Sequence, residues 1–372
     1  GYKAHASIET HAATAIFENG KLTMWASSQT PFGTREEVAG LLKLPKEKVH
    51  IKQIFLGGGF GGKIYNRQAN EAARIAKMVE GTPIQLMWSR EEEFMYDMFR
   101  PAAVIKVNSG VTKDGIIKFW DFNIYCAGDR GTELFYDVPN HKTTTLDKSG
   151  VHPFGTGAWR APGNNTNTFA RESQIDIMAH KIGMDPLEFR LKNMNNQRAI
   201  NSLKLAAEKF GWTSAKPPKG TGRGIAVGTD AGTLVTVIVE VKVNAQTGEV
   251  KVTRAVVGQD MGQVINPEGT IIQAEGCVNM GLGYALSEDI EFDWGEVKTK
   301  NFGDYDLPLF STIPPQIDTV WVDAMDKPPQ GGGEPAIICM GGAVANAVFE
   351  ACGARVFRLP VTKERILEAM KK

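Results

Sequence analysis

The sequence predicts an α+β fold in which helices pack on mixed sheets. Three observations lead to this prediction. Apolar runs flank two short turn sequences, a pattern typical of antiparallel hairpins. Longer segments with helical spacing of apolar residues lie between the strands. Strands and helices do not alternate strictly, as they would around a parallel sheet. A length of 372 residues allows two or three domains at roughly 100–200 residues each.

The first half of the chain contains the first of the two hairpins. Ala103–Asn108 and Ile116–Tyr125 are predicted strands on either side of Lys113-Asp114-Gly115. Asp185-Pro186 predicts a helix start, because Asp is a favoured N-cap and Pro a favoured first residue. The other elements predicted here are a short helix at Glu36–Leu42, a strand at Val49–Phe55, and helices at Asn66–Val79 and Asn167–Ile182.

The second half repeats this mixture. Leu234–Val243 and Glu249–Val257 flank the turn at Asn244–Gly248 and form the second predicted hairpin. Asn266-Pro267 predicts the start of a helix that runs to Leu286. Closing helices are predicted at Ala343–Ala351 and Thr362–Met370.

A segment rich in Pro, Gly and Lys lies between the two halves. Thr213–Gly222 has the sequence TSAKPPKGTG, which interrupts the apolar periodicity and predicts a linker. We therefore expect a first domain at residues 1–212 and a second at residues 223–372.

Charge and hydropathy argue against a nucleic-acid binder and against a membrane-spanning protein. Lys plus Arg and Asp plus Glu both number 42, so the chain lacks the basic field of a nucleic-acid binder. No apolar run reaches the ~18 residues of a membrane span. We expect a cytoplasmic protein, although the periplasm stays open because the chain begins at Gly1 rather than Met. The four cysteines, whose spacing matches neither a zinc nor an iron–sulfur motif, are Cys126, Cys277, Cys339 and Cys352.

The most distinctive motif is a glycine loop at Gly57–Lys63, with the sequence GGGFGGK. It follows a predicted strand and precedes a predicted helix, a geometry whose free backbone N–H groups favour a bound phosphate. The spacing satisfies the start of a Walker A loop, but Ile64 stands where Ser or Thr must hold Mg²⁺. The loop therefore predicts a phosphate-bearing cofactor rather than nucleotide hydrolysis. A glycine-rich turn selected for tight packing is the alternative.

Three further polar residues stand in settings suited to a ligand. Arg160, in Ala158–Gly163 (AWRAPG), could bind an anionic cofactor edge with two hydrogen bonds, or form a structural salt bridge. Glu334, in Gly331–Pro335 (GGGEP), could act as a general base if an apolar pocket raised its pKa; a solvated loop carboxylate is the alternative. Gln273, on a helix rich in small residues, could contact a ligand ring or be an ordinary buried amide.

His5, Glu9 and His11 are residue types that bind metals, within the sequence HASIETH. Their order does not match the H-E-x-x-H zinc motif. Alternation predicts a strand with all three side chains on one face, so we expect a polar strand face rather than a metal triad.

Taken together, five segments resemble one family. GGGFGGK, AWRAPG, ESQIDIMAHKIGMDPLEFRLKN, D-x-G-x-x-I-N-P with Q-x-E-G, and GGGEP occur in this order along the chain. The set resembles the molybdopterin-binding subunit of the xanthine oxidase and aldehyde oxidase family, most closely the C-terminal part of the isoquinoline oxidoreductase type. The resemblance covers nearly the whole chain and implies two molybdopterin-binding domains.

The resemblance implies a molybdenum hydroxylase subunit, or part of one, that oxidises an N-heterocycle or an aldehyde with oxygen from water. The metal would be held by a dithiolene pterin, which could carry a cytosine dinucleotide, and no protein group would ligate it directly. By resemblance, Glu334 is the catalytic base that deprotonates the metal's hydroxo ligand. The implied cofactor-binding residues are Gly58, Gly59, Phe60, Gly61, Gly62, Arg160, Ala161 and Gln273, and Arg100 and Ile64 are implied at the substrate pocket.

Some features depart from the family pattern. Ile64 replaces the Glu of xanthine-type members, which argues against xanthine as substrate, and Lys3 stands where those members commonly carry a Gln. The family's G-Q-G-rich pterin segment is absent, so we expect another chain to complete the cofactor site. Electrons would pass to [2Fe–2S] clusters on an iron–sulfur subunit. The alternatives are a non-catalytic cofactor-binding or scaffold chain and, with less support, a P-loop-like nucleotide-binding protein.

Overall fold

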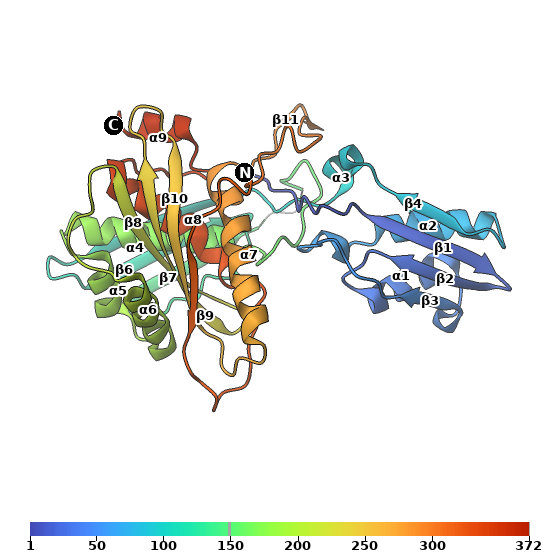
Figure 1. Ribbon diagram of the computed structural model, residues 1–372, viewed down its shortest axis with the longest axis horizontal. Helices are drawn as coiled ribbons and strands as arrows, with labels where there is room; N and C mark the ends of the chain where they lie inside the picture. Colours follow the sequence, from blue (N-terminus) through green and yellow to red (C-terminus); the bar gives the residue numbers. More distant parts are fainter. Residues whose placement is uncertain (148–149, 372) are drawn as a thin grey trace.

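The computed structural model describes residues 1–147 and 150–371 and confirms the α+β class. Residues 12–87 form an N-terminal lobe around a four-stranded sheet of order β3-β2-β1-β4, with helices α1 and α2 packed on it (Figure 1). The elements of this lobe are β1 (Ala12–Glu18), β2 (Lys21–Ala26), α1 (Pro31–Leu42), β3 (Val49–Lys52), α2 (Arg67–Met78) and β4 (Ile84–Met87).

The N-terminal lobe is built from a tight hairpin and a small-residue helix. Asn19 and Gly20 have φ of 50° and 68°, as a type I′ turn between β1 and β2 requires. Alternate residues of both strands are buried. α2 meets them through Ala69, Ala72, Ala73 and Ala76, whose small side chains let the helix lie close to the sheet.

A short helix and a three-stranded sheet follow the lobe. Helix α3 (Arg90–Tyr96) starts at a capping box, in which Ser89 and Glu92 satisfy each other's backbone N–H groups. Strands β5 (Val104–Val111) and β6 (Ile117–Tyr125) are antiparallel, which confirms the first predicted hairpin. β7 (Asn140–Leu146) pairs with β6 in parallel.

The largest core surrounds a second four-stranded sheet of order β13-β10-β9-β8. β9 and β10 are antiparallel, which confirms the second predicted hairpin. β9 is buried along most of its length because both faces of the sheet are covered. Val237 and its alternate neighbours face the core shared with α7 and α8, and Ile238 faces the core shared with α6. The strands are β8 (Thr221–Asp230), β9 (Thr233–Val243), β10 (Val250–Asp260) and β13 (Ile317–Trp321).

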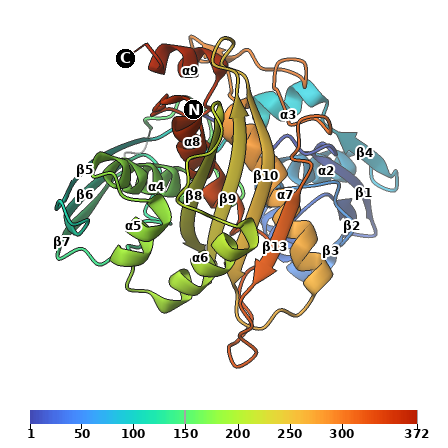
Figure 2. The same cartoon turned by 60° about the vertical axis from the view of Figure 1, so that its left-hand side comes forward.

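Within the residues that the structure describes, six helices complete this part of the molecule. α6 lies on one face of the sheet, while α8 packs on the other face and α4 packs against α8 (Figure 2). A small hairpin, β11 (Phe292–Asp293) and β12 (Glu296–Val297), projects near α3. The helices are α4 (Asn164–Lys181), α5 (Pro186–Asn193), α6 (Gln197–Phe210), α7 (Pro267–Leu286), α8 (Ile337–Cys352) and α9 (Lys363–Ala369).

The predicted helix starts at Asp185-Pro186 and Asn266-Pro267 are confirmed, since Asp185 and Asn266 cap α5 and α7 with their side chains. The other differences from prediction lie at element ends. α1 begins earlier, at Pro31, β3 ends earlier, at Lys52, and α4 begins earlier, at Asn164. α8 also begins early, at Ile337 rather than Ala343, and runs through Gly341-Gly342. The helix packs tightly there, since a Cβ on Gly342 would lie 3.2 Å from the Cβ of Glu172 in α4 and 3.3 Å from that of Ala226 in β8.

The strand predicted at His5–His11 is wrong. The residues between these two histidines form no strand, and Ala6 has a φ of 49°. His5 and His11 are buried and bind Asp97, just after α3, and Glu93, within α3, while Glu9 binds Lys63. Tertiary partners, rather than a shared strand face, account for these three polar residues.

The predicted linker is irregular as far as residue 220, and β8 begins at Thr221. One hydrophobic core joins residues from both sides of it, including Ile175, Phe189 and Ile225. The division at residues 212 and 223 stays a prediction. Among the described helices, none combines the length and the apolar character needed to cross a membrane.

Candidate cofactor site

Four of the predicted motifs meet at Arg160. Its Nε and Nη2 donate to the carbonyl oxygen of Gly333 at 3.0 and 2.5 Å. Nη2 also donates to Oε1 of Gln273 at 2.9 Å. The backbone N–H of Arg160 donates to the carbonyl of Phe60 at 2.9 Å. The structure thus brings the glycine loop, the AWRAPG turn, Gln273 on α7 and the GGGEP loop to one point.

The turn that carries Arg160 is held in place by α4. Ala161 has a φ of 59°, a left-handed conformation that is uncommon for alanine. Nδ2 of Asn165, in the first turn of α4, donates to the carbonyls of Arg160 and Ala161 at 2.8 and 2.9 Å. These two bonds stabilise the strained backbone, so the start of the helix sets the position of the Arg160 side chain.

The glycine loop presents unused backbone donors. Gly58, Phe60 and Gly61 have φ of 95°, 55° and 111°. The N–H of Gly61 donates to Oε1 of Gln29 at 3.0 Å. Within residues 1–147 and 150–371, the N–H groups of Gly58, Gly59 and Phe60 find no acceptor in the chain. Consecutive free N–H groups in such a loop form a concave site for an anionic or polar ligand edge.

A close backbone contact makes Gly61 sensitive to substitution. A Cβ there would lie 2.1 Å from the carbonyl oxygen of Ala158, in a conformation that L-residues rarely adopt. We expect Gly61→Ala to lower the free energy of unfolding by about 2–6 kcal/mol, combining backbone strain with overpacking. Gly81→Ala is the matched control, because Gly81 also has a positive φ but open space around it. Gly81→Ala should lower the free energy of unfolding by about 1–2 kcal/mol. Urea unfolding of both variants measures the difference, and equal losses would contradict the close-contact argument.

The loop lysine does not point toward a phosphate. Lys63 is buried, and its Nζ binds Oε2 of Glu9 at 2.5 Å. The same carboxylate accepts the N–H of Gly57 at 2.8 Å. The loop lies between β3 and α2, as predicted, but a single 3₁₀ turn and extended Tyr65 separate it from the first turn of α2. Both features weigh against the P-loop alternative.

Glu334 lies at the rim of this site, and its surroundings differ from those we expected. Its side chain is 40% exposed, and Oε2 accepts a hydrogen bond from Nη2 of Arg130 at 3.0 Å. The apolar pocket considered for this carboxylate is therefore not present. Arg130 is itself held by the buried Asp230, through two bonds of 2.8 Å each.

Arg130 is the site residue that sequence reasoning missed. It lies in a loop after β6, far along the chain from both Asp230 and Glu334, and no motif marks it. Asn164 Nδ2 also donates to Oδ1 of Asp230 at 2.8 Å, so the start of α4 supports this ion pair as well as the Arg160 turn. The chain Asp230–Arg130–Glu334 fixes the direction of the Glu334 carboxylate.

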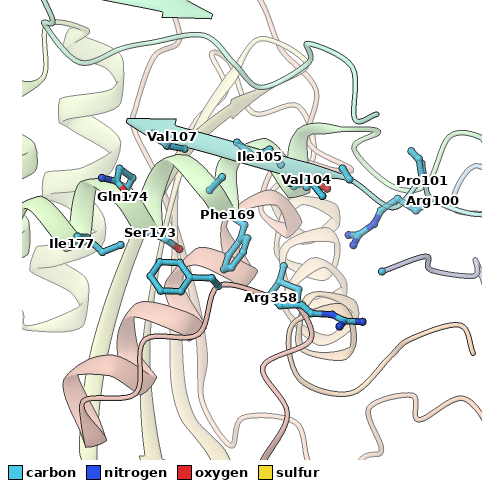
Figure 3. A pocket seen from close by; sticks show the side chains of 16 residues that line it. Arg100, Pro101, Val104, Ile105, Val107, Phe169, Ser173, Gln174, Ile177 and Arg358 are labelled. Atoms are coloured by element: carbon cyan, nitrogen blue, oxygen red, sulfur yellow. The ribbon is translucent and has the colours of Figure 1, made fainter. Parts of the chain in front are cut away.

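The two predicted substrate-pocket residues lie apart. Arg100 lines a cavity of about 550 Å³ between β5, α4 and the segment 357–359 (Figure 3). Its guanidinium lies over the rings of Trp159 and Tyr284, at 5.3 and 5.2 Å from the centroids. Ile64 stays in the 3₁₀ turn after the glycine loop and does not line this cavity. Neither does Glu334, so this cavity is separate from the Arg160 cluster.

Beneath the GGGEP loop lies a buried thiol. Sγ of Cys277, on α7, approaches the carbonyls of Gly333 and Glu334 at 3.5 and 3.7 Å. Burial raises the pKa of this thiol to about 11, although the charge of Arg160 opposes the shift. Cys277 therefore stays protonated near neutral pH and acts as a weak donor that supports the loop.

Family models and relatives agree with this geometry. Two models described as "Molybdopterin cofactor-binding domain" match residues 1–194 and residues 167–314. The chain belongs to the molybdopterin cofactor-binding family. This confirms the resemblance to xanthine oxidase and aldehyde oxidase subunits.

Similar proteins include a nicotinate dehydrogenase subunit of Pseudomonas putida, 29% identical over 99% of this chain and 34% of the relative. The beta subunit of isoquinoline 1-oxidoreductase from Brevundimonas diminuta is 28% identical over 96% of this chain and 47% of the relative. The fold of quinoline 2-oxidoreductase from Pseudomonas putida 86 matches with a TM-score of 0.88 at 16% identity, over 100% of this chain and 75% of that one. The chain thus spans about a third to a half of these two sequence relatives.

The residues present fit a molybdopterin group. Free N–H groups of the glycine loop and the amide of Gln273 lie around Arg160, so polar donors and acceptors converge on one side of the loop. At Gly276, a Cβ would meet only Nη1 of Arg160, at 3.7 Å. Gly276 on α7 therefore lies beside the guanidinium without a side chain of its own.

Proposed function

We propose that this chain is the catalytic, molybdopterin-binding subunit of a molybdenum hydroxylase, or part of one. Its substrate would be an N-heterocycle or an aldehyde, oxidised with oxygen from water. The single observation that supports this most is the convergence of Phe60, Gln273 and Gly333 on Arg160. The names of the relatives, which act on nicotinate and isoquinoline, support the substrate class.

The cofactor would be held mainly by backbone groups. Gly58, Gly59 and Phe60 offer free N–H donors, while Gly61 lets the loop approach the Ala158 backbone and Gly62 lets it approach the side chains of His5 and Asp97. Arg160, with Ala161, and Gln273 would bind polar edges of the pterin. When bound, the molybdenum group supplies two-electron redox chemistry that inserts water-derived oxygen into the substrate. The proposal includes both forms of the pterin, with and without a cytosine dinucleotide.

Glu334 would be the general base. A half-exposed carboxylate at the rim of the site can accept a proton from the oxygen nucleophile and release it to solvent. Arg130 keeps the carboxylate aimed and Asp230 keeps Arg130 in place. Arg100 and Ile64 would contact the substrate if another part of the protein closes the gap between them.

Partners are part of the proposal. The four cysteines are free, and their spacing matches no iron–sulfur motif. Electrons would therefore leave to [2Fe–2S] clusters on an iron–sulfur subunit, and a further polypeptide would complete the molybdopterin site. We propose that the assembly works in the cytoplasm; the periplasm is the alternative location.

Metal and cofactor analysis of the natural complex tests the function. We expect molybdenum and pterin in about equimolar amounts with this chain, iron in a co-purifying chain, and ¹⁸O from labelled water in the oxidised product. Molybdenum without turnover of any N-heterocycle or aldehyde would support the non-catalytic scaffold instead. A complex with neither molybdenum nor pterin would overturn the proposal. Mg²⁺-dependent nucleotide binding would favour the P-loop alternative.

A further inference from the structure

His5 lies between two acceptors. Its Nδ1 is 2.7 Å from Oδ2 of Asp97, and its Nε2 is 2.6 Å from the carbonyl oxygen of Ala158. The side chain is 1% exposed. A carboxylate and a carbonyl can only accept hydrogen bonds, so both ring nitrogens must donate. The geometry therefore requires the doubly protonated imidazolium.

The side chains of His5 and Asp97 also touch the glycine loop. A Cβ on Gly62 would lie 2.7 Å from Oδ2 of Asp97 and 2.9 Å from Nδ1 of His5. Ala158, the carbonyl partner of His5, stands two residues before Arg160 and against Gly61. The His5 ring thus joins three elements: the end of α3, the glycine loop and the backbone that leads into Arg160.

Other titratable groups lie around the His5 ring. His11 lies between Glu93 and the loop, with Nδ1 2.9 Å from Oε1 of Glu93 and Nε2 3.3 Å from the carbonyl of Gly62. Tyr65 faces the same segment, since its hydroxyl accepts the N–H of Ala158 at 3.1 Å.

His11, Glu93 and Asp97 are close enough to ligate a metal ion. However, each is already hydrogen-bonded within the cluster, and His5 has no lone pair left to offer.

Electrostatics favour the protonated ring. Burial alone lowers the pKa of His5, but the charge and hydrogen bond of Asp97, with the carbonyl of Ala158, outweigh burial and raise it above its usual value. Burial alone would raise the pKa of Asp97, but the charge and hydrogen bond of His5 lower it. The stabilisation is therefore complete below the pKa of an unfolded histidine, about 6.5. It is lost as pH rises through the higher folded-state value.

We propose that His5, in its protonated form and held by Asp97, is a positioning residue that fixes the glycine loop relative to the Arg160 turn. This rests on the proposed function in one respect, that these two segments hold the cofactor. A neutral ring can donate only one of its two hydrogen bonds, so either Oδ2 of Asp97 or the Ala158 carbonyl loses its bond to His5. The loop and the turn then lose their common anchor, and the cofactor is released.

The protonation of His5 can be measured in the wild-type complex without reference to the cofactor. Hydrogen–deuterium exchange at the imidazole C2 position, followed by mass spectrometry from pH 5 to 10, gives a titration midpoint for each histidine. We expect the midpoint of His5 in the folded complex to lie above the midpoint of the same residue after the complex is unfolded in urea. Equal midpoints would overturn the proposal, whatever the function of the complex.

Cofactor retention tests the positioning role. Asp97→Asn keeps the size of the side chain and removes its charge, and we expect pterin loss to begin at a lower pH than in the wild type. His5→Gln should lower pterin occupancy at least about fivefold at neutral pH, and His50→Gln should leave it unchanged. Wild-type retention that does not depend on pH, or an Asp97→Asn profile like that of the wild type, would overturn the proposal. A complex with raised His5 midpoint but no pterin at any pH would instead overturn the proposed function.

Discussion

Replacing Glu334 by glutamine should lower turnover by about 10²- to 10⁴-fold, the usual contribution of a general base. Glutamine keeps the length of the side chain and an oxygen that can accept the bond from Nη2 of Arg130. It cannot accept a proton from the nucleophile. Because the carbonyl of Gly333, rather than the Glu334 side chain, binds Arg160, the cofactor cluster should stay intact.

The measurement is steady-state turnover at saturating substrate together with molybdenum and pterin content. We expect kcat to fall while KM changes little and cofactor content equals that of the wild type. Glu208→Gln is the control, since it makes the same chemical change on the exposed surface of α6. Full turnover in Glu334→Gln with normal cofactor content would remove Glu334 from the role of base.

A large effect on stability is expected at Glu172, in the middle of α4. Its side chain is fully buried and accepts hydrogen bonds from Tyr136 at 3.0 Å and from Arg190 at 3.1 Å. The N–H of Val227 on β8 also donates to it, at 3.1 Å, and Arg171 lies at 3.4 Å. One carboxylate thus ties α4 to α5 and to the edge of the second sheet.

Glu172→Gln would place an amide NH₂ among these donors and leave two buried guanidinium groups without a counter-charge. Breaking a buried ion pair on one side costs about 3–5 kcal/mol. That is a large part of the ~5–15 kcal/mol by which a domain is stable. The midpoint of urea unfolding checks the prediction against Glu188→Gln, which lies exposed on neighbouring α5. A shift no larger than that of Glu188→Gln would show that the network is not needed for stability.

Local patterns in the sequence were sufficient for much of the fold. Both hairpins follow from turn residues between apolar runs, and the starts of α5 and α7 follow from Asp185-Pro186 and Asn266-Pro267. Each of these signals acts within a few residues, so it survives without knowledge of the rest of the chain. The early start of α8 was missed because Gly341-Gly342 is unfavourable in an isolated helix, whereas in the fold these glycines lie close to Tyr284 on α7, Glu172 on α4 and Ala226 on β8.

For the site, the sequence by itself determined the segments: the glycine loop, the AWRAPG turn, Gln273 and the GGGEP loop, in an order that identified the family. Only the tertiary structure decided how their side chains are used. Lys63 turned inward to Glu9, Glu334 met Arg130 at the rim, and His5 met Asp97 instead of lying on a strand face. The physical reason is that the protonation and direction of a polar side chain depend on partners brought together by folding, and these partners lie far apart in sequence.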